Sequence, residues 1–190
     1  MRSCCPPVLI LLILAPVLSL GLARCAPPDE TPSLSETSAP PVPDQEAWGW
    51  STLVTRAGRR QAEVSSEHFQ RFDRDKKALL DGGVTVHFYN ARGTKRVSTL
   101  TARRAEIDDR SKHMIASGDV VLVAEDSTRL ETDALCWHRE TEKITGEGRV
   151  TICRPDGRES GVGFEATSDL KRWSMLEVTT RLGRPDSTKQ

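Results

Sequence analysis

Apolar residues recur at every second position in short runs along most of the chain, from residue 46 to about residue 182. The run 84–88 reads Val-Thr-Val-His-Phe and the run 150–152 reads Val-Thr-Ile. A period of two residues is typical of a β-strand with one buried face. Because this region contains no sustained period of 3.6 residues, the pattern predicts an all-β fold.

Turn-forming residues separate these runs. Gly, Asn, Asp and Pro favour tight turns through their backbone preferences. We expect the chain to reverse at each of the clusters Asp81-Gly82-Gly83, Asn90–Gly93, Ser117-Gly118-Asp119, Gly146-Glu147-Gly148 and Arg154–Gly157.

A weak internal repeat refines this prediction. The phrase Gly-x-Val-x-apolar begins at Gly82, Gly118 and Gly148. Before each copy lies a pair of runs that meets at polar residues, in 69–80, 105–116 and 135–146, and a partial fourth copy spans 164–176. Each unit therefore reads as strand, polar turn, strand, glycine turn, strand. Such units bury their apolar faces only by stacking side by side, which predicts an extended, curved sheet.

The alternation also predicts which side chains face the interior. The intervening positions are largely Thr, Arg, Glu, His and Lys, as expected for a solvated outer face. The sequence leaves open whether the interior is a filled core or a groove that holds acyl chains. The candidate lipid-binding residues are Phe69, Leu80, Val84, Val86, Phe88, Ile107, Met114, Val120, Leu122, Leu135, Trp137, Ile144, Val150, Ile152 and Phe164, with Ala78 and Ala105 beside them.

Two tryptophans, Trp48 and Trp50, stand at the start of this region. They belong either to the apolar face of the first strand or to the mouth of a groove. We favour the first interpretation.

The N-terminus carries an export signal. Arg2 precedes the apolar stretch Val8–Ala23, which is shorter than the about 20 residues of a membrane-spanning helix. The stretch ends in Leu22-Ala23-Arg24-Cys25, which resembles a bacterial lipobox, although Arg24 stands where that motif normally has Gly, Ala or Ser. Acylation at Cys25, an uncleaved membrane anchor and ordinary signal cleavage all remain open. All three export the chain, and the first two tether it to a membrane.

The remaining domain boundaries follow from composition. Residues 26–45 are rich in Pro, Ser, Thr, Asp and Glu and have little apolar surface to bury, which predicts a disordered linker. We therefore expect a signal peptide or anchor over 1–25, the linker over 26–45, a β domain over 46–183 and a flexible tail over 184–190.

Charge and side-chain chemistry exclude several function classes. The 27 basic and 27 acidic side chains balance, which argues against a nucleic-acid partner. There is no nucleotide-binding, hydrolase or Rossmann motif. The turn residues Asp108-Asp109 are better explained by local hydrogen bonding than by catalysis. We therefore expect a binding protein without enzymatic activity or cofactor.

Metal and disulfide chemistry have little support. Cys136 and His138, two apart, share a face of one expected strand, but no further pair of ligands supports a metal site there, and we expect none. Cys136 and Cys153 form either one disulfide bridge or two buried thiols.

Several segments, in their order and spacing, resemble LptC of the lipopolysaccharide-export system. The resemblance covers roughly residues 49–178. Its segments are 79–84 (Leu-Leu-Asp-Gly-Gly-Val), 98–102, 116–120, 130–137, 144–149, 151–157, 161–166 and 168–170.

This resemblance implies an open β-jelly roll, the folded antiparallel sheet of LptA/OstA-like proteins. It implies a periplasmic domain, anchored to the inner membrane, whose apolar interior takes up the acyl chains of lipopolysaccharide. The lipid would come from the LptB–LptF–LptG ABC transporter and pass to an LptA-like bridge through edge-to-edge strand pairing. LptC of model bacteria has an N-terminal spanning helix, whereas this chain has a signal-like segment and a candidate lipidated cysteine.

Three alternatives remain. The chain could be a soluble LptA-like periplasmic bridge, which acylation at Cys25 would argue against. It could be a structural lipoprotein that binds only protein partners, which an interior without a cavity would favour. An enzyme would need a buried polar cluster around Cys136 and His138.

Overall fold

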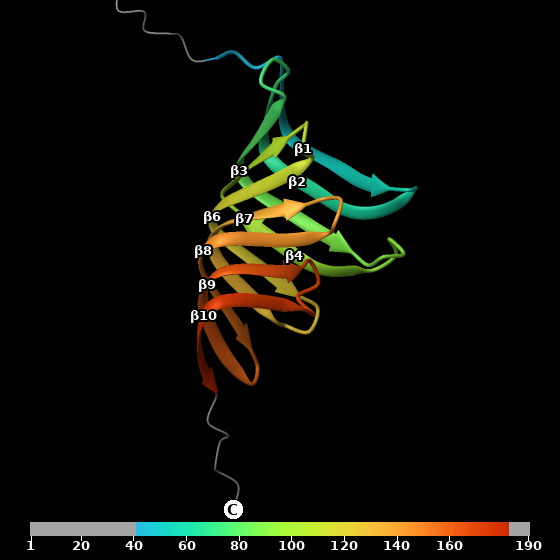
Figure 1. Cartoon of the computed structure of the whole chain (residues 1–190). Helices are drawn as coiled ribbons and strands as arrows, with labels where there is room; N and C mark the ends of the chain where they lie inside the picture. Colours follow the sequence, from blue (N-terminus) through green and yellow to red (C-terminus); the bar gives the residue numbers. More distant parts are fainter. Residues whose placement is uncertain (1–40, 183–190) are drawn as a thin grey trace, which may run out of the picture. The chain divides into compact units, whose positions relative to one another are not determined.

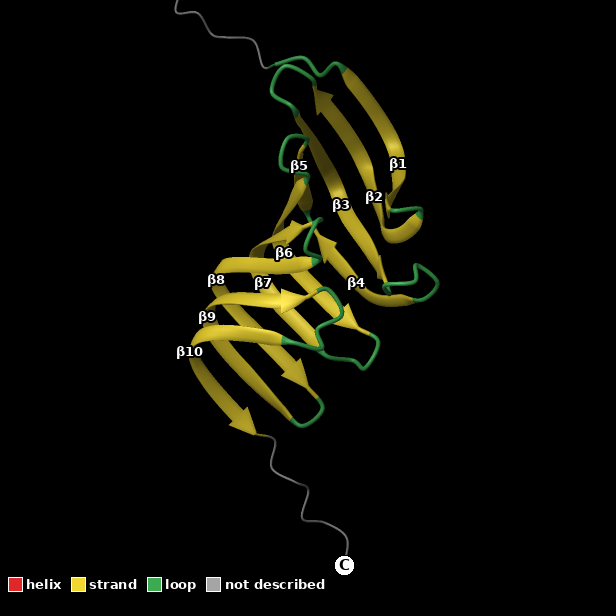
Figure 2. Cartoon of the chain, turned by 45° about the vertical axis from the view of Figure 1, so that its right-hand side comes forward, coloured by secondary structure: helices red, strands yellow, loops and turns green. Residues whose placement is uncertain are grey.

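The computed structural model describes residues 41–182, and this part of the chain consists of strands and loops (Figure 2). The predicted all-β fold class is confirmed. The strands are β1 (Gln45–Arg56), β2 (Arg59–Phe72), β3 (Lys77–Tyr89), β4 (Arg96–Ala102), β5 (Arg104–Asp108), β6 (His113–Ala124), β7 (Arg129–His138), β8 (Lys143–Arg154), β9 (Gly157–Thr167) and β10 (Trp173–Leu182).

All ten strands form one antiparallel sheet in which neighbours in sequence are mostly neighbours in space (Figure 1). The order is β1-β2-β3-β4-β6-β7-β8-β9-β10, and β5 continues the place of β4 between β3 and β6. Within residues 41–182, β1 and β10 each pair with a single strand. The sheet is therefore open, with a free edge at each end.

The predicted polar turns are confirmed, but the predicted glycine turns are wrong. Loops join the strands around residues 73–76, 109–112, 139–142 and 168–172, and also at 90–95 and 155–156. In contrast, β3 runs through Gly82-Gly83, β6 through Gly118 and β8 through residues 146–148. The repeated glycines mark irregularities inside long strands and do not end them.

These irregularities align across the sheet as one line of bends. Register shifts fall between Ser66 and His68 on β2 and between Ser117 and Val120 on β6. At the same level Arg103 interrupts β4 and β5, accepting a hydrogen bond from Gly83 N (3.1 Å) and donating one to the Gly118 carbonyl (2.9 Å). In Figure 2, strands β8 to β10 double back along this line at the left-hand margin. The bends fold the sheet onto itself.

Glycine permits the bend where backbones approach closely. Gly82 has a φ of +77°, in the left-handed region that favours glycine, and a Cβ at this position would lie 2.7 Å from Cβ of Glu67 on β2. The repeated glycine phrase therefore has a structural reason, which differs from the turn that the sequence suggested.

The bend also keeps both halves of each strand facing the same interior. On β7 the buried residues Thr132 and Leu135 are three apart, and on β9 the buried Gly161 and Phe164 are three apart. In a regular strand such residues would face opposite sides. The extra residue at the bend reverses the alternation, so the apolar side chains of both halves meet between two layers.

The first strand shows the same effect on its tryptophans. Trp50 packs against the core and stacks on Phe69, with ring centroids 4.4 Å apart, as predicted. Trp48 is 71% exposed and stacks on His68 on the outer face, so its predicted inward placement is wrong. Gly49 between them has a φ of +62°, which breaks the regular alternation.

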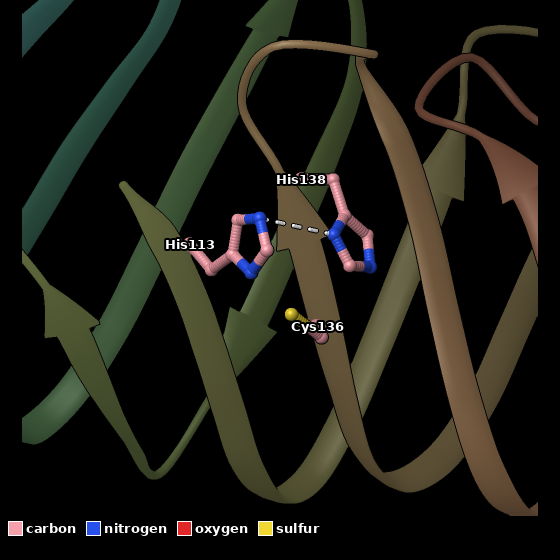
Figure 3. Close-up of side chains that lie close together, drawn as sticks. All are labelled: His113, Cys136 and His138. Carbon is pink, nitrogen blue, oxygen red and sulfur yellow. Dashed lines mark hydrogen bonds between the residues drawn. The ribbon is translucent and has the colours of Figure 1, made fainter. Parts of the chain in front are cut away.

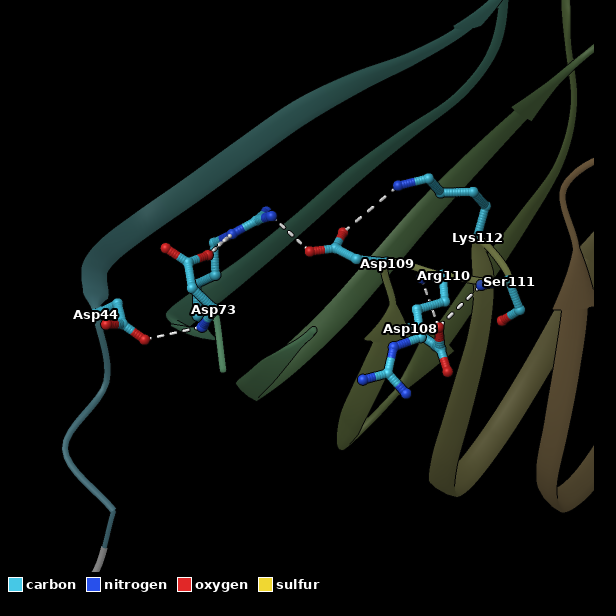
Figure 4. A network of polar contacts seen from close by, with 8 residues as sticks. Asp44, Asp73, Asp108, Asp109, Arg110, Ser111 and Lys112 are labelled. Atoms are coloured by element: carbon cyan, nitrogen blue, oxygen red, sulfur yellow. Dashed lines mark hydrogen bonds and ion pairs between the residues drawn. The ribbon is translucent and has the colours of Figure 1, made fainter. Parts of the chain in front are cut away.

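A polar network joins the start of β1 to the turns after β2 and β5 (Figure 4). Asp44 Oδ2 accepts a hydrogen bond from Asp73 N (2.8 Å), and Arg71 forms ion pairs with Asp73 and Asp109. Lys112 Nζ lies 3.9 Å from Asp109 Oδ1. The end of the expected linker, at Asp44 and Gln45, is thus attached to the sheet.

The other N- and C-terminal predictions lie outside the described residues. They are the signal peptide or anchor over 1–25 with its candidate Cys25, most of the linker over 26–45 and the tail over 184–190. Within residues 41–182 there is no helix of sufficient length and hydropathy to cross a membrane.

Candidate functional site

The apolar interior between the two layers contains the predicted site residues. All of them except Ile107 are buried, with exposures between 0 and 7%. Ile107 is partly buried and packs against the same cluster. Phe88 of β3 meets Trp137 of β7 edge to face, with ring centroids 5.2 Å apart, although β4 and β6 lie between these two strands in the sheet order. The bend therefore gathers these residues into one cluster.

Several interior residues were missed by the sequence reasoning. Val64, Leu100 and Leu130 are each at most 1% exposed. Leu100 shares its inward face with the buried Ser98, and Leu130 shares its face with the buried Thr132. Buried and exposed residues alternate in these runs, but some of the buried residues are polar. The pattern of apolar residues alone therefore does not reveal the inner face.

The interior is filled by its own side chains. Leu80, Val86, Leu100, Leu122 and Ile144 each have 0% exposure. Hollows of about 200–550 Å³ lie on the described surface, and they are lined mainly by polar and charged residues. The described interior is thus packed with side chains.

Two buried polar atoms in the described residues have no hydrogen-bond partner: Trp137 Nε1 and Gln61 Oε1. A buried donor or acceptor without a partner costs about 1–3 kcal/mol, so such groups are uncommon. Trp137 carries its unpaired N–H in the apolar cluster, where its ring meets Phe88.

Polar contacts close the two layers on one side, where the β1–β2 hairpin meets the β7–β8 turn. Gln61 Nε2 donates to the Arg139 carbonyl (3.1 Å) and to Glu142 Oε1 (3.0 Å). Arg139 Nη2 donates to the Thr55 carbonyl (2.8 Å). We call these three hydrogen bonds the closing contacts. Nearby, where Glu142 and Ser168 line the same hollow, Ser98 Oγ donates to the Ser168 carbonyl in the β9–β10 turn.

Both free edges carry exposed apolar side chains. On β1, Leu53 is 50% exposed, and on β10, Leu176 is 70% exposed and Val178 49%. An unpaired edge presents free backbone N–H and C=O groups that can pair with a strand of another chain.

Titratable groups near the turns have perturbed pKa values. The pKa of Asp108 lies below its ordinary value because the backbone N–H groups of Ser111 and Arg110 donate to the carboxylate. Hydrogen bonding to Asp73 raises the pKa of Arg71. Asp108 thus makes local hydrogen bonds within its turn, as the sequence indicated, whereas Asp109 forms an ion pair with Arg71 of β2.

Cys136 and Cys153 are both free and half-buried, so the disulfide alternative is wrong for this structure. Burial raises the pKa of the Cys136 thiol. Burial, and then the neighbouring His113, lower the pKa of His138, while Glu165 opposes this shift. His113, Cys136 and His138 lie together on the outer face, away from the apolar interior.

Comparisons with known proteins agree with this architecture. A family model described as "LptC: Lipopolysaccharide-assembly, LptC-related" matches residues 8–182. The crystal structure of LptH from Pseudomonas aeruginosa, described as the LptA homologous periplasmic component of the lipopolysaccharide transport device, has a similar fold. Its TM-score is 0.50 at 9% identity, over 65% of this chain and 95% of that chain. No curated protein matches this chain.

Proposed function

We propose, from the premise that this chain belongs to the LptC-related family of lipopolysaccharide-assembly proteins, that its β domain is a non-enzymatic lipid-transfer module. In this proposal it accepts lipopolysaccharide from an LptB–LptF–LptG ABC transporter and passes it to an LptA-like bridge. The observation that carries the proposal is the continuous apolar interior, which extends from Val64 on β2 to Phe164 on β9.

The open sheet supports transfer between proteins. Free edges at β1 and β10 allow a strand of a partner to extend the sheet on either side. Partners with the same fold, docked edge to edge, would place their interiors in line. An acyl chain could then move between proteins without contact with water.

Uptake of a lipid requires the closed interior to open. Each methylene transferred from water to an apolar interior contributes about 0.8 kcal/mol, so a few acyl chains offset the loss of several polar contacts. The closing contacts link the layers through Gln61, Arg139 and their partners, and these residues are at the ends of strands. We propose that the layers separate there. Trp137 Nε1 would then donate to a carbonyl oxygen where an acyl chain is attached.

We also propose that the N-terminal segment holds the domain at the periplasmic face of the inner membrane. The family match begins at residue 8, where the apolar stretch Val8–Ala23 begins. Acylation at Cys25 and retention of this stretch as an anchor both fit the proposal. Incorporation of labelled fatty acid into wild type but not into Cys25→Ser would show that Cys25 is acylated.

Photo-crosslinking in cells tests the lipid proposal. A photoreactive aromatic residue at Trp137 replaces an interior side chain with one of similar size. The matched control is Thr151 on β8, which faces outward and contacts Ser160 Oγ (3.1 Å) between the buried Val150 and Ile152. We expect a lipopolysaccharide adduct at Trp137 and none at Thr151.

The filled interior favours a second candidate function, that of a structural lipoprotein whose β domain binds only protein partners. The same experiment separates the two. If neither position labels lipopolysaccharide while edge positions on β1 or β10 crosslink to proteins, the domain is an assembly component. If Thr151 labels as strongly as Trp137, the lipid contacts the outer face and the interior is not its site.

A further inference from the structure

Three metal-ligating side chains meet on the outer face of β6 and β7 (Figure 3). His113 and His138 are directly paired across the two strands. Cys136 is two residues before His138 and therefore shares its face. The sequence showed only the Cys136–His138 pair, because His113 is far away along the chain and strand pairing alone brings it into the cluster.

The distances suit a tetrahedral metal ion. His113 Nε2 and His138 Nδ1 are 3.3 Å apart. Two nitrogen ligands on tetrahedral zinc, with bonds of about 2.0–2.1 Å, are also about 3.3–3.4 Å apart. The Cys136 sulfur completes a triangle in which all three ligand atoms lie within 4.8 Å of one another.

A second hydrogen bond orients His138 for this role. Its Nε2 lies 2.8 Å from Thr145 Oγ1 on β8. When Nε2–H donates to the threonine, the lone pair of Nδ1 is directed at the space between the three ligands. Metal-binding histidines commonly have such a partner on the other ring nitrogen.

Nearby charges are compatible with a cation. Lys143 on β8, which is directly paired with His138, forms an ion pair with Glu165 (2.6 Å). The Glu165 carboxylate, which favours the positively charged form of His138, thus offsets the charge of Lys143 beside the cluster.

We propose that His113, Cys136 and His138 bind one transition-metal ion of the zinc class, with a fourth coordination position open to water. Two imidazoles and a thiolate suit Zn²⁺, Co²⁺ or copper, whereas Mg²⁺ and Ca²⁺ prefer oxygen ligands. Because the three residues are only half-buried, the ion has access from solvent. The site is on the opposite face of the sheet from the interior, so its ligands do not line the proposed lipid site.

Binding would join the ends of β6 and β7. His138 immediately precedes Arg139, which makes two of the closing contacts, so the ion would also stiffen the base of the β7–β8 turn. We expect added Zn²⁺ to raise the melting temperature of the metal-free chain.

Titration of the full-length, reduced chain with Co²⁺ tests the site, followed by displacement with Zn²⁺. We expect a thiolate-to-cobalt charge-transfer band that saturates at one ion per chain and disappears when Zn²⁺ is added. Cys136→Ser should abolish the band, and His113→Gln and His138→Gln should weaken binding strongly. Thr145→Val, which removes only the orienting hydrogen bond, should lower affinity by about 10–100-fold.

Two control variants distinguish this site from other thiols and imidazoles. Cys153→Ser and His87→Gln change a half-buried cysteine and histidine outside the cluster and should leave binding unchanged. Absence of the band in wild type, or a band that persists in Cys136→Ser and is lost only when the N-terminal cysteines are replaced, would overturn the proposal.

Discussion

Gly146 provides a sharp test of how tightly the folded sheet is packed. A Cβ added at this position on β8 would lie 2.3 Å from Cε1 of Phe164 and 3.1 Å from the Ala134 carbonyl oxygen. Phe164 is 6% exposed, so its ring has little freedom to move away. We expect Gly146→Ala to force a rearrangement that lowers the free energy of unfolding by about 1–3 kcal/mol.

Gly148, two residues further along β8, is the matched control. A Cβ there has no atom within 4 Å, and neither glycine adopts a left-handed φ. Both alanine variants restrict the unfolded chain equally, which favours folding by about 0.4–1 kcal/mol. The difference between the variants therefore measures the clash of the added Cβ with Phe164 and Ala134.

Urea unfolding of the two variants and wild type, followed by tryptophan fluorescence, gives this difference. It should also appear as a lower melting temperature for Gly146→Ala, by roughly 2–4 °C per kcal/mol. In a Phe164→Leu background the cost of Gly146→Ala should fall, because the ring atoms that clash are absent. Equal stability of the two alanine variants would refute the packing described for this part of the sheet.

Three further predictions concern the core, a turn carboxylate and the cysteines. Leu100→Ala should destabilise by about 2–5 kcal/mol, while Leu176→Ala, at a 70% exposed side chain, should change stability by less than about 0.5 kcal/mol in denaturant unfolding. Because hydrogen bonds lower the pKa of Asp108, its ionised form stabilises the fold above pH 3.8; the stability gap between wild type and Asp108→Ala, measured against pH, should close as pH falls below that value. Since Cys136 and Cys153 are free, wild type and Cys153→Ser should show the same change in melting temperature on adding reductant; a drop confined to wild type would contradict this.

The alternation of apolar and polar residues predicted most of the interior side chains correctly. Alternation placed Val84, Val86 and Phe88 on one face, because a strand presents successive side chains to opposite sides wherever its backbone is regular. It failed at Trp48, where Gly49 breaks the regularity, and it missed Leu100, whose inward neighbours include a serine. The order and spacing of short motifs along the sequence also indicated the family.

Two features of this protein followed from sequence alone: the all-β class and the identity of most interior side chains. Both follow from strand geometry, which sets the side-chain pattern over residues close together in the chain. The bend of the sheet and the cluster of His113, Cys136 and His138 were decided only by tertiary structure. The repeated glycines indicated that the chain changes direction, but not whether it does so at a bulge inside a strand or at a turn between strands. Both features need the backbone conformations that glycine adopts easily. Strand pairing then determined which distant residues became neighbours.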